Sequence, residues 1–444
     1  MAENTNIALR SSLIYQVFNR QHNKTGTFKE LEKDLERIKN LGTDYVYLLP
    51  IHEIGQKQKK GELGCPYSIK DYYSINSEYG NLEDFKSLLA AVHKKGMKLI
   101  MDIVFNHTSR DSVMLETHGD LYFKNEKGEL SNRIGDWWDI TDLDYRKKEL
   151  YPVMIDILKY WANMGVDGFR CDVASFLPKD FWLQAREQIV HVNKDIIWIA
   201  ESVHASSVKF MRDSGFGALS DSEVYEAFDI CYDYDIHNFY LGYFKGENSL
   251  QDYLDALMRQ ETMYAENYVK LRCLENHDQP RIASLVRDYD KLLNFTAFNS
   301  FLKGTTMVYA GQEARADHHP DLFNIDKVDW SLLNNSKEIS DIIRTIADLK
   351  KKDSIFTQGA FKINTMHVDG LVHIEYENSE KTIHGFFNLG GVEGCLKTGL
   401  PELDAELFTN MLTGEKVQIF QGNIPIYSSP VIIEILKTNP NRKT

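Results

Sequence analysis

Short apolar runs alternate with amphipathic stretches from about residue 12 to about residue 350. Residues 13–18 form an apolar run, and the next apolar positions, between residues 28 and 41, recur at helical spacing before Gly42. Residues 45–49 form a second apolar run, which Pro50 closes. The pattern predicts a strand, a helix and a strand in succession.

The same unit recurs along the chain. Asn81 can cap a helix that ends at Gly96, and a later helical pattern stops at Gly165. With the first two runs included, eight runs are predicted as strands. They are residues 13–18, 45–49, 98–104, 166–171, 196–200, 216–219, 268–274 and 305–309.

The apolar character of these strands indicates the fold class. Strands this apolar must be covered on both faces, which is typical of a parallel sheet wrapped by helices. Eight strand and helix units over this length fit a closed (β/α)8 TIM barrel with insertions. An open doubly wound sheet is the alternative, but no G-x-G-x-x-G sequence follows the first predicted strand. The prediction is an α/β protein with a (β/α)8 barrel.

Two segments depart from the repeating unit. Residues 105–144, after the third predicted strand, are too long for an ordinary loop and predict a short insertion. After residue 353 the chain turns to short alternating runs, which predict a C-terminal antiparallel β-sandwich. These runs are residues 361–366, 371–377, 381–388, 417–420 and 431–436. The predicted domains are a barrel of residues 1–104 and 145–353, an inserted subdomain of residues 105–144, and a sandwich of residues 354–444.

Charge and composition narrow the partners. The 444 residues carry a formal net charge of −14, which argues against nucleic acid and against an anionic membrane surface. No apolar run approaches the roughly 18 residues of a membrane-spanning helix. The five cysteines are dispersed and indicate reduced thiols. No signal peptide is visible, so we expect a cytoplasmic protein that acts on a neutral substrate.

Polar side chains gather at the predicted strand ends. A barrel builds its active site at the carboxyl ends of its strands, so these residues are expected to meet at one mouth. A single acid after a strand is usually a helix cap or a solvated loop residue, but four strand ends carrying such residues together point to chemistry. The residues are Asp102, His107, Arg170, Asp172, Glu201, His277 and Asp278.

A set of carboxylates with an arginine fits two chemistries. One is metal binding, in a metal-dependent barrel hydrolase. The other is cleavage of a glycosidic bond, which needs one carboxylate as nucleophile and another as proton donor. Neither H-x-H on the first predicted strand nor H-E-x-x-H on a helix is present in the sequence. Glycoside cleavage is therefore favoured.

Four segments together resemble the α-amylase family of retaining glycoside hydrolases. They are D-I-V-F-N-H at 102–107, G-F-R-C-D at 168–172, the segment ending at Glu201, and E-N-H-D at 275–278. Two further matches are G-C-P-Y-S-I at 64–69 and G-T-T-M-V-Y-A-G-Q-E at 304–313. The resemblance covers nearly the whole chain, and it implies the same barrel, insertion and C-terminal sandwich.

The resemblance implies a role for each candidate residue. Asp172 would be the nucleophile, Glu201 the acid/base, and Asp278 a third catalytic acid that binds sugar hydroxyls. Asp102 would support the site through Arg170. The residues expected to bind substrate are Tyr67, His107, Arg170 and His277. No cofactor is required by this chemistry. Asn106 matches a calcium ligand of the family, and calcium is left open because its other ligands cannot be placed.

The implied substrate is a neutral α-glucan oligosaccharide of the maltodextrin kind. Cleavage of α-1,4 bonds is expected, with α-1,6 bonds as a further option because Val173 follows the expected nucleophile. The alternatives are an α-glucan transglycosylase of the same family and a non-catalytic carbohydrate-binding relative. Trp137 and Trp138 either line a sugar subsite or pack within the insertion. The sequence leaves open endo against exo attack and the oligomeric state.

Overall fold

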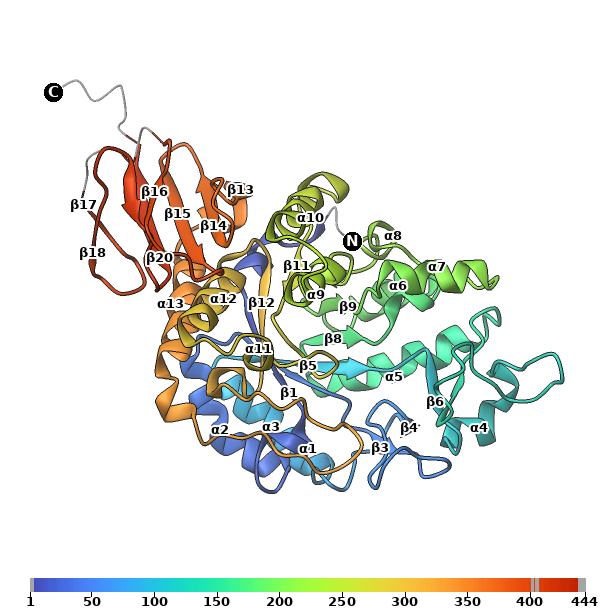
Figure 1. Ribbon diagram of the computed structural model, residues 1–444. Helices are drawn as coiled ribbons and strands as arrows, with labels where there is room; N and C mark the ends of the chain where they lie inside the picture. The colour runs from blue at the N-terminus through green and yellow to red at the C-terminus, as the bar shows by residue number, and fades with distance from the viewer. Residues whose placement is uncertain (1–3, 401–402, 404–406, 438–444) are drawn as a thin grey trace.

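The computed structural model describes residues 4–400, 403 and 407–437, and it has a closed barrel of eight parallel strands at its centre (Figure 1). Neighbouring strands follow one another around the barrel in chain order, and the last pairs with the first. The strands are β1 (Leu13–Val17), β2 (Tyr45–Leu48), β5 (Lys98–Ile103), β8 (Gly168–Cys171), β9 (Ile197–Ala200), β10 (Ile230–Tyr232), β11 (Lys270–Arg272) and β12 (Thr305–Tyr309).

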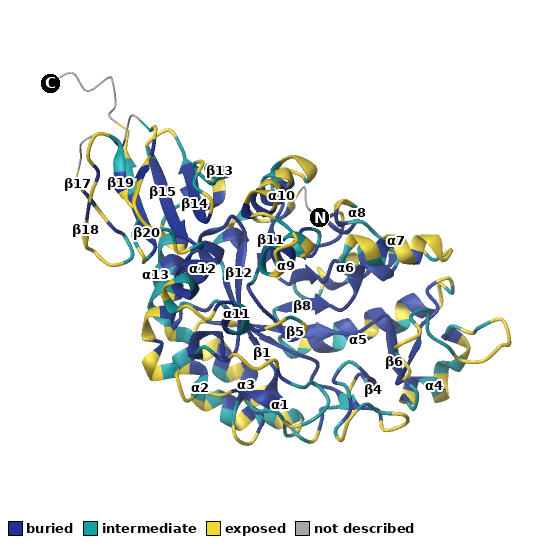
Figure 2. Cartoon of the chain, viewed as in Figure 1, coloured by how far each residue is buried: buried dark blue, intermediate teal, exposed yellow. Residues whose placement is uncertain are grey.

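Both faces of these strands are buried, as the apolar runs predict (Figure 2). Ile14 pairs with Tyr45 of β2 and with Met307 of β12, which closes the barrel. Because side chains alternate along a strand, one set fills the interior and the other meets the helices. The interior set includes Ile14, Tyr47, Ile100, Ile199, Ile230, Leu271 and Met307.

Helices surround the barrel, and their ends follow the local sequence (Figure 1). Thr27 caps α2, Asn81 forms a capping box with Asp84 at the start of α3, and Gly165 ends α5 with a left-handed φ of 104°. The main helices are α2 (Phe28–Asn40), α3 (Leu82–Lys94), α5 (Leu150–Met164), α6 (Lys179–Ile189), α7 (Ala205–Asp213), α9 (His237–Lys245), α10 (Leu250–Met263), α12 (Tyr289–Phe301) and α13 (Lys337–Lys352).

The sixth strand corrects the sequence prediction. It is β10, and residues 216–219 instead connect α7 to α8 (Asp221–Val224). The apolar side chain of Phe216 serves a different contact: its ring packs on Phe123 of the insertion, with the two centroids 5.8 Å apart. β10 has only three residues between two aspartates, so its apolar run is too short to stand out in the sequence.

The chain leaves the barrel after β5 and returns at α5. Between them lie β6 (His107–Ser109), α4 (Val113–His118) and β7 (Ile140–Asp142), and β6 pairs with β7 in antiparallel fashion. The predicted limits of this insertion, 105 and 144, stay a prediction. In Figure 1 the insertion and the C-terminal domain lie at opposite sides of the barrel.

The C-terminal domain is built on an antiparallel sheet of β13, β14, β15 and β20 in that order. One face joins the barrel core, where Tyr376 and Phe387 pack on Phe301 of α12. The other face forms a second core with two antiparallel strand pairs, β16–β19 and β17–β18, so the sheet is one half of a sandwich. The strands are β13 (Ala360–Asn364), β14 (Leu371–Glu377), β15 (Lys381–Asn388), β16 (Cys395–Lys397), β17 (Leu407–Thr409), β18 (Lys416–Gln418), β19 (Asn423–Pro425) and β20 (Val431–Leu436). The predicted fold class is confirmed.

Two predictions from composition can also be compared with the structure. All five cysteines are free thiols, as their spacing predicts. Among the residues that the structure describes, no helix has both the length and the apolar character needed to cross a membrane.

Candidate active site

Strand register brings the candidate residues together. Asp102 of β5 pairs with Arg170 of β8, while Cys171 of β8 pairs with Ala200 of β9. Asp172 and Glu201 are the next residues of those two strands, so they emerge side by side at the carboxyl end of the barrel. The backbone N–H of Glu201 donates to the carbonyl of Cys171 over 3.0 Å, which fixes this relation.

Arg170 is the centre of the charge network. Its guanidinium is fully buried, and Nη1 donates to Asp102 Oδ1 over 2.9 Å and to Asp172 Oδ1 over 3.0 Å. Nη2 lies 3.1 Å from Glu201 Oε2. Burial opposes the charge, but Asp102 and then Glu201 outweigh it and raise the pKa of Arg170. One permanent cation therefore holds three carboxylates in place.

Asp102 lies beneath the site and is fully occupied by protein groups. Besides Arg170, it accepts hydrogen bonds from Tyr47 over 2.6 Å and from Tyr67 over 2.9 Å. The Tyr67 hydroxyl also lies 2.6 Å from Nε2 of His277. Asp102 therefore orients Arg170 and Tyr67.

Asp278 is held by its neighbours on the opposite side of the mouth. Its Oδ2 lies 3.0 Å from Nε2 of His277, and its backbone N–H donates to Asn276 Oδ1 over 2.8 Å. Burial opposes the charged carboxylate, but His277 and then Arg170 outweigh it, so the pKa of Asp278 is lowered. The His277 ring stacks on the Tyr67 ring, with 5.4 Å between the centroids and 13° between the planes.

Asp172 and Glu201 lie against the same guanidinium. Burial, and after it the Glu201 carboxyl, raise the pKa of Asp172, while Arg170 acts in the opposite direction. Glu201 accepts a hydrogen bond from the backbone N–H of Val173 over 2.7 Å, and this bond also goes to Oε2. Oε1 of Glu201 takes part in neither of these contacts, since Val173 and Arg170 both approach Oε2.

Val173 adopts an unusual backbone conformation at this point. Its φ is 35°, in a region that a β-branched residue rarely enters. The conformation turns its N–H toward Glu201, so the strain has an identifiable use. The sequence singled out Val173 only as a neighbour of Asp172, because backbone dihedral angles leave no direct mark in one sequence.

The residues open into one cavity of about 310 Å³. Five of the predicted residues line it, namely Tyr67, His107, Asp172, Glu201 and Asp278. Arg170 and Asp102 lie beneath it, and His277 lies behind Tyr67. Trp137 is in the lining as well, with its ring 5.5 Å from that of His107.

Comparison with known families settles what this architecture is. Residues 14–360 match the family model described as Alpha amylase, catalytic domain. The chain belongs to the α-amylase family. Residues 362–433 match the model described as Bacterial Alpha amylase C-terminal domain. The resemblance drawn from the four sequence segments is therefore confirmed at the level of the family.

Solved structures of α-amylase family proteins are similar over the whole chain. An α-amylase from Lactobacillus plantarum has a TM-score of 0.91 and 37% identity, covering 97% of this chain and 100% of that one. A maltogenic α-amylase from Thermotoga neapolitana has a TM-score of 0.86 and 32% identity, with the same coverage.

Curated relatives are longer than this chain. Neopullulanase 2 of Thermoactinomyces vulgaris is 23% identical over 91% of this chain and 69% of its own length. The chain spans 36% and 40% of the length of the next two relatives that it matches.

The structure adds residues to the family site that the motifs did not indicate. Lys60 lines the cavity and forms an ion pair with Asp139 of the insertion, with 3.1 Å between Nζ and Oδ1. Its ammonium also lies over the rings of Trp138 and Phe323, 4.7 Å and 5.7 Å from their centroids. Lys60 thus joins three loops at one wall. Its sequence surroundings, a short polar run, gave no signal of this role.

The surroundings of Asn106 do not fit calcium. Its Oδ1 accepts a hydrogen bond from Nη2 of Arg133 over 3.1 Å, and a guanidinium has no lone pair for a metal. In this α-amylase family site, Asn106 Oδ1 therefore pairs with a guanidinium.

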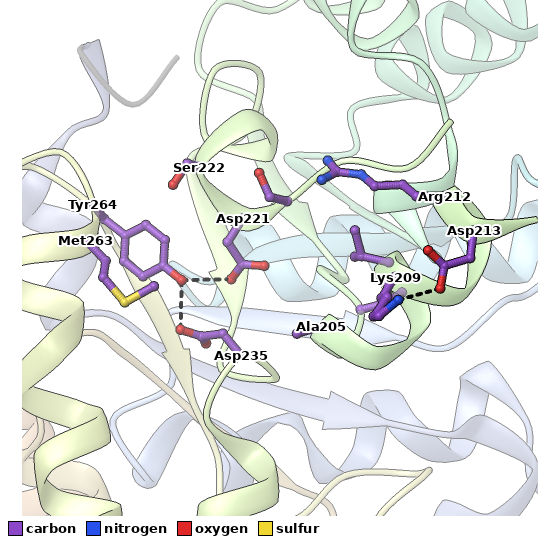
Figure 3. Close-up of a pocket in the computed structure, with 12 residues that line it drawn as sticks. Ala205, Lys209, Arg212, Asp213, Asp221, Ser222, Asp235, Met263 and Tyr264 are labelled. Carbon is purple, nitrogen blue, oxygen red and sulfur yellow. Dashed lines mark hydrogen bonds and ion pairs between the residues drawn. The ribbon is translucent and has the colours of Figure 1, made fainter. Parts of the chain in front are cut away.

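A second cavity, of about 410 Å³, is lined by residues of α7, α8 and α10. Figure 3 shows the Tyr264 hydroxyl pointing at Asp221 and Asp235, 3.5 Å and 2.7 Å from their oxygens. Lys270 of β11 forms ion pairs with both carboxylates. Burial raises the pKa of Asp221. This network joins the start of β11 to α8 and to the segment that follows β10.

Proposed function

We propose that this α-amylase family protein hydrolyses α-glucosidic bonds in short maltooligosaccharides with retention of anomeric configuration. One observation carries the proposal. Asp172 and Glu201 contact the same Arg170 guanidinium and line the same cavity, with Asp278 in that cavity too. Retaining enzymes need their two carboxyls roughly 5–5.5 Å apart, and a shared guanidinium suits such a separation.

In the first step Asp172 attacks the anomeric carbon while Glu201 gives a proton to the leaving oxygen. The bond from the anomeric carbon to the leaving oxygen breaks, and a covalent bond to Asp172 forms. Arg170 favours the ionised form of Asp172 for this attack, because it offsets part of the cost of a buried charge. Oε1 of Glu201 delivers the proton, since Oε2 is engaged by Val173 and Arg170.

In the second step the Glu201 carboxylate takes a proton from water, and the water oxygen attacks the anomeric carbon. The bond to Asp172 breaks, and the sugar leaves with its original configuration. Two displacements at the same carbon restore the starting configuration.

The remaining side chains bind the sugar ring at the cleavage point. The Tyr67 ring, fixed by stacking on His277, offers a flat apolar face to the sugar. Asp278 stays ionised and accepts hydrogen bonds from hydroxyl groups. Asn106 donates to Nδ1 of His107 over 3.1 Å, which leaves the His107 proton on Nε2 as a donor. Burial lowers the pKa of His107, so the neutral ring is favoured.

The wall around Lys60 supports a short substrate. Loop residues from three parts of the chain meet there, including a hydrogen bond of 3.0 Å from the Leu63 N–H to the Phe323 carbonyl. The cavity volume is at the low end of the range for ligand sites. We assign mainly α-1,4 cleavage, with α-1,6 bonds as a second substrate type. The similarity to a neopullulanase and to a maltogenic α-amylase supports this choice.

The free thiols support action in a reducing compartment, and we assign the protein to the cytoplasm.

The test is to follow maltoheptaose and panose cleavage by proton NMR and to identify the first anomer released. We expect the α-anomer from α-linked substrate, because two displacements retain configuration. Early release of the β-anomer, or no cleavage of any α-glucan, would contradict the proposal. Analysis of the products at high maltose concentration separates hydrolysis from transfer to a second sugar.

A further inference from the structure

Asn106 and Asp142 meet where the insertion joins the barrel. Asn106 lies between β5 and β6, and Asp142 ends β7, opposite His107 in the β6–β7 ladder. Asn106 Nδ2 donates to Asp142 Oδ1 over 3.4 Å, and each residue is 2% exposed. A buried carboxylate beside an amide oxygen is an anionic pocket that needs a positive charge.

The positive charge comes from Arg133 of the insertion. Its Nε donates to Asp142 Oδ2 over 2.7 Å, and its backbone N–H donates to the same oxygen over 2.9 Å. Nη2 donates to Asn106 Oδ1 over 3.1 Å and to the Leu143 carbonyl over 3.3 Å. A carboxylate, an amide oxygen and a backbone carbonyl are the oxygen types that calcium prefers, and here all three face one guanidinium.

The guanidinium is enclosed as well as paired. Its carbon lies 5.9 Å from the centroid of the Phe123 ring and 5.8 Å from that of Phe216. The side chain of Arg133 is 11% exposed. Phe123 belongs to the insertion, whereas Phe216 follows α7 of the barrel, so Arg133 also connects the two parts. A flat cation between aromatic rings is stabilised in a way that a metal ion with its waters is not.

We propose that the guanidinium of Arg133 takes the place of a calcium ion, and that it positions His107 by fixing Asn106. Arg133 is not among the residues that line the catalytic cavity, so it is a positioning residue. Its effect passes through Asn106, whose Nδ2 holds Nδ1 of His107 over 3.1 Å. Protein stability and activity are then independent of calcium. Only the activity readout rests on the proposed glycosidase function.

The first test needs no substitution. The Tm of the full chain is measured by calorimetry after exhaustive EDTA treatment and again with millimolar calcium chloride, and calcium binding is followed by titration calorimetry. We expect the same Tm in both conditions and no binding at this site. A Tm that falls in EDTA and returns with calcium would overturn the proposal, whether or not the enzyme cleaves α-glucans.

The second test compares three variants. Arg133→Ala leaves Asp142 buried without a cation, so we expect a fall in Tm of about 5 °C or more. Arg133→Lys keeps the charge but not the forked hydrogen bonds, and we expect an intermediate Tm. Arg146→Ala is the matched control, because Arg146 pairs with Asp144 in the same segment but is 73% exposed. We expect its Tm to equal that of the wild type.

Kinetics at 25 °C separate positioning from stability. If Arg133 positions His107, kcat of Arg133→Ala on maltoheptaose falls between about 10- and 100-fold while the protein is still folded, and KM changes less. Arg133→Lys recovers part of kcat. Wild-type kcat and Tm in Arg133→Ala would overturn the proposal. If Arg133→Ala fails to fold, the EDTA and calcium measurements on the wild type still test whether Arg133 takes the place of calcium.

Discussion

At the scale of single residues, Arg170 is the cation that pairs with the carboxylates of the site. It contacts Asp102, Asp172 and Glu201 from a fully buried position. Removing one partner of a buried ion pair typically costs about 3–5 kcal/mol, because the other charge is left without compensation. Without Arg170 the site would keep three carboxylates that have lost the cation they share.

We therefore predict that Arg170→Ala loses about 3–5 kcal/mol of unfolding free energy, together with its activity. Arg170→Lys should fold, because a charge remains, but its single ammonium cannot reproduce the contacts of the guanidinium. Urea unfolding and maltoheptaose turnover measure both effects. An Arg170→Ala variant with wild-type stability would contradict the central place given to this residue.

At neutral pH the Asp172 side chain should lower the free energy of unfolding. Burial raises its pKa in the folded state above the unfolded value of about 4, so ionising it costs free energy only in the folded protein. This cost is absent at pH values below the unfolded pKa. It grows as the pH rises from the unfolded pKa to the folded pKa, and it is constant above the folded pKa.

Asp172→Asn should therefore have a higher Tm than the wild type at pH 7–8, and the difference should shrink toward pH 4. Its turnover should fall to the background rate, because an amide cannot form the glycosyl-enzyme. Calorimetry across the pH range measures the first effect. An equal Tm gap at pH 4 and pH 8 would show that the raised pKa of Asp172 is not its cause.

The role of Glu201 as proton donor can be tested with substrates whose leaving groups differ in their need for a proton. Glu201→Gln keeps the hydrogen bond from Val173 but cannot donate or accept the catalytic proton. We predict a loss in kcat of about 10²–10⁴-fold on maltooligosaccharides. A substrate whose leaving group departs without protonation, such as a glycosyl fluoride, should lose much less in its first step. Equal losses on both substrates would contradict the role of general acid.

At the scale of elements, the wall formed by the Lys60 loop and the insertion limits substrate length. Lys60→Ala removes the ion pair with Asp139 and the contact with Phe323, so the wall should open. We predict that kcat/KM for maltoheptaose rises relative to that for maltotriose. Lys59→Ala is the control. Lys59 Nζ donates a hydrogen bond to Gln56 Oε1 over 3.0 Å, and Lys59 is not among the residues that line the cavity. The same substrate ratio in both variants would contradict this role.

The elements also show how far sequence could predict the fold and the site. Seven of the eight barrel strands follow from apolar runs between helical segments, because a strand buried on both faces must be apolar throughout. The sixth does not, since β10 is short and the apolar run at 216–219 begins with Phe216, which packs on Phe123 of the insertion. Asp172 and Glu201 could be predicted as neighbours because each directly follows a predicted strand. The register of β8 and β9 then places them side by side.

Other parts of the site depend on tertiary contacts and could not be predicted. Arg133 is near Asn106 only because the insertion folds back on β6, and no spacing in the sequence marks it. Lys60 and Phe323 are more than 250 residues apart and meet only once the barrel closes. The unusual φ of Val173 is equally invisible in the sequence.

At the scale of the whole molecule, the barrel and the C-terminal domain share one core. Phe301 of α12 contacts Tyr376 and Phe387 of the terminal sheet, with ring centroids 5.4 Å and 5.6 Å apart. The domains therefore cannot separate without exposing large aromatic side chains. We predict a single calorimetric transition, and a loss of about 3–5 kcal/mol in Phe387→Ala. Two well-resolved transitions would contradict a shared core.

The central claim is that Asp172 forms a covalent bond to the sugar during turnover. The most direct measurement is to trap that species with a fluorinated α-glycosyl fluoride, which slows the second step, and to locate it by mass spectrometry of the digested protein. The account predicts one added glycosyl group on the peptide that contains Asp172, and none in Asp172→Asn. A glycosyl group on another residue, or turnover without any covalent species, would contradict it.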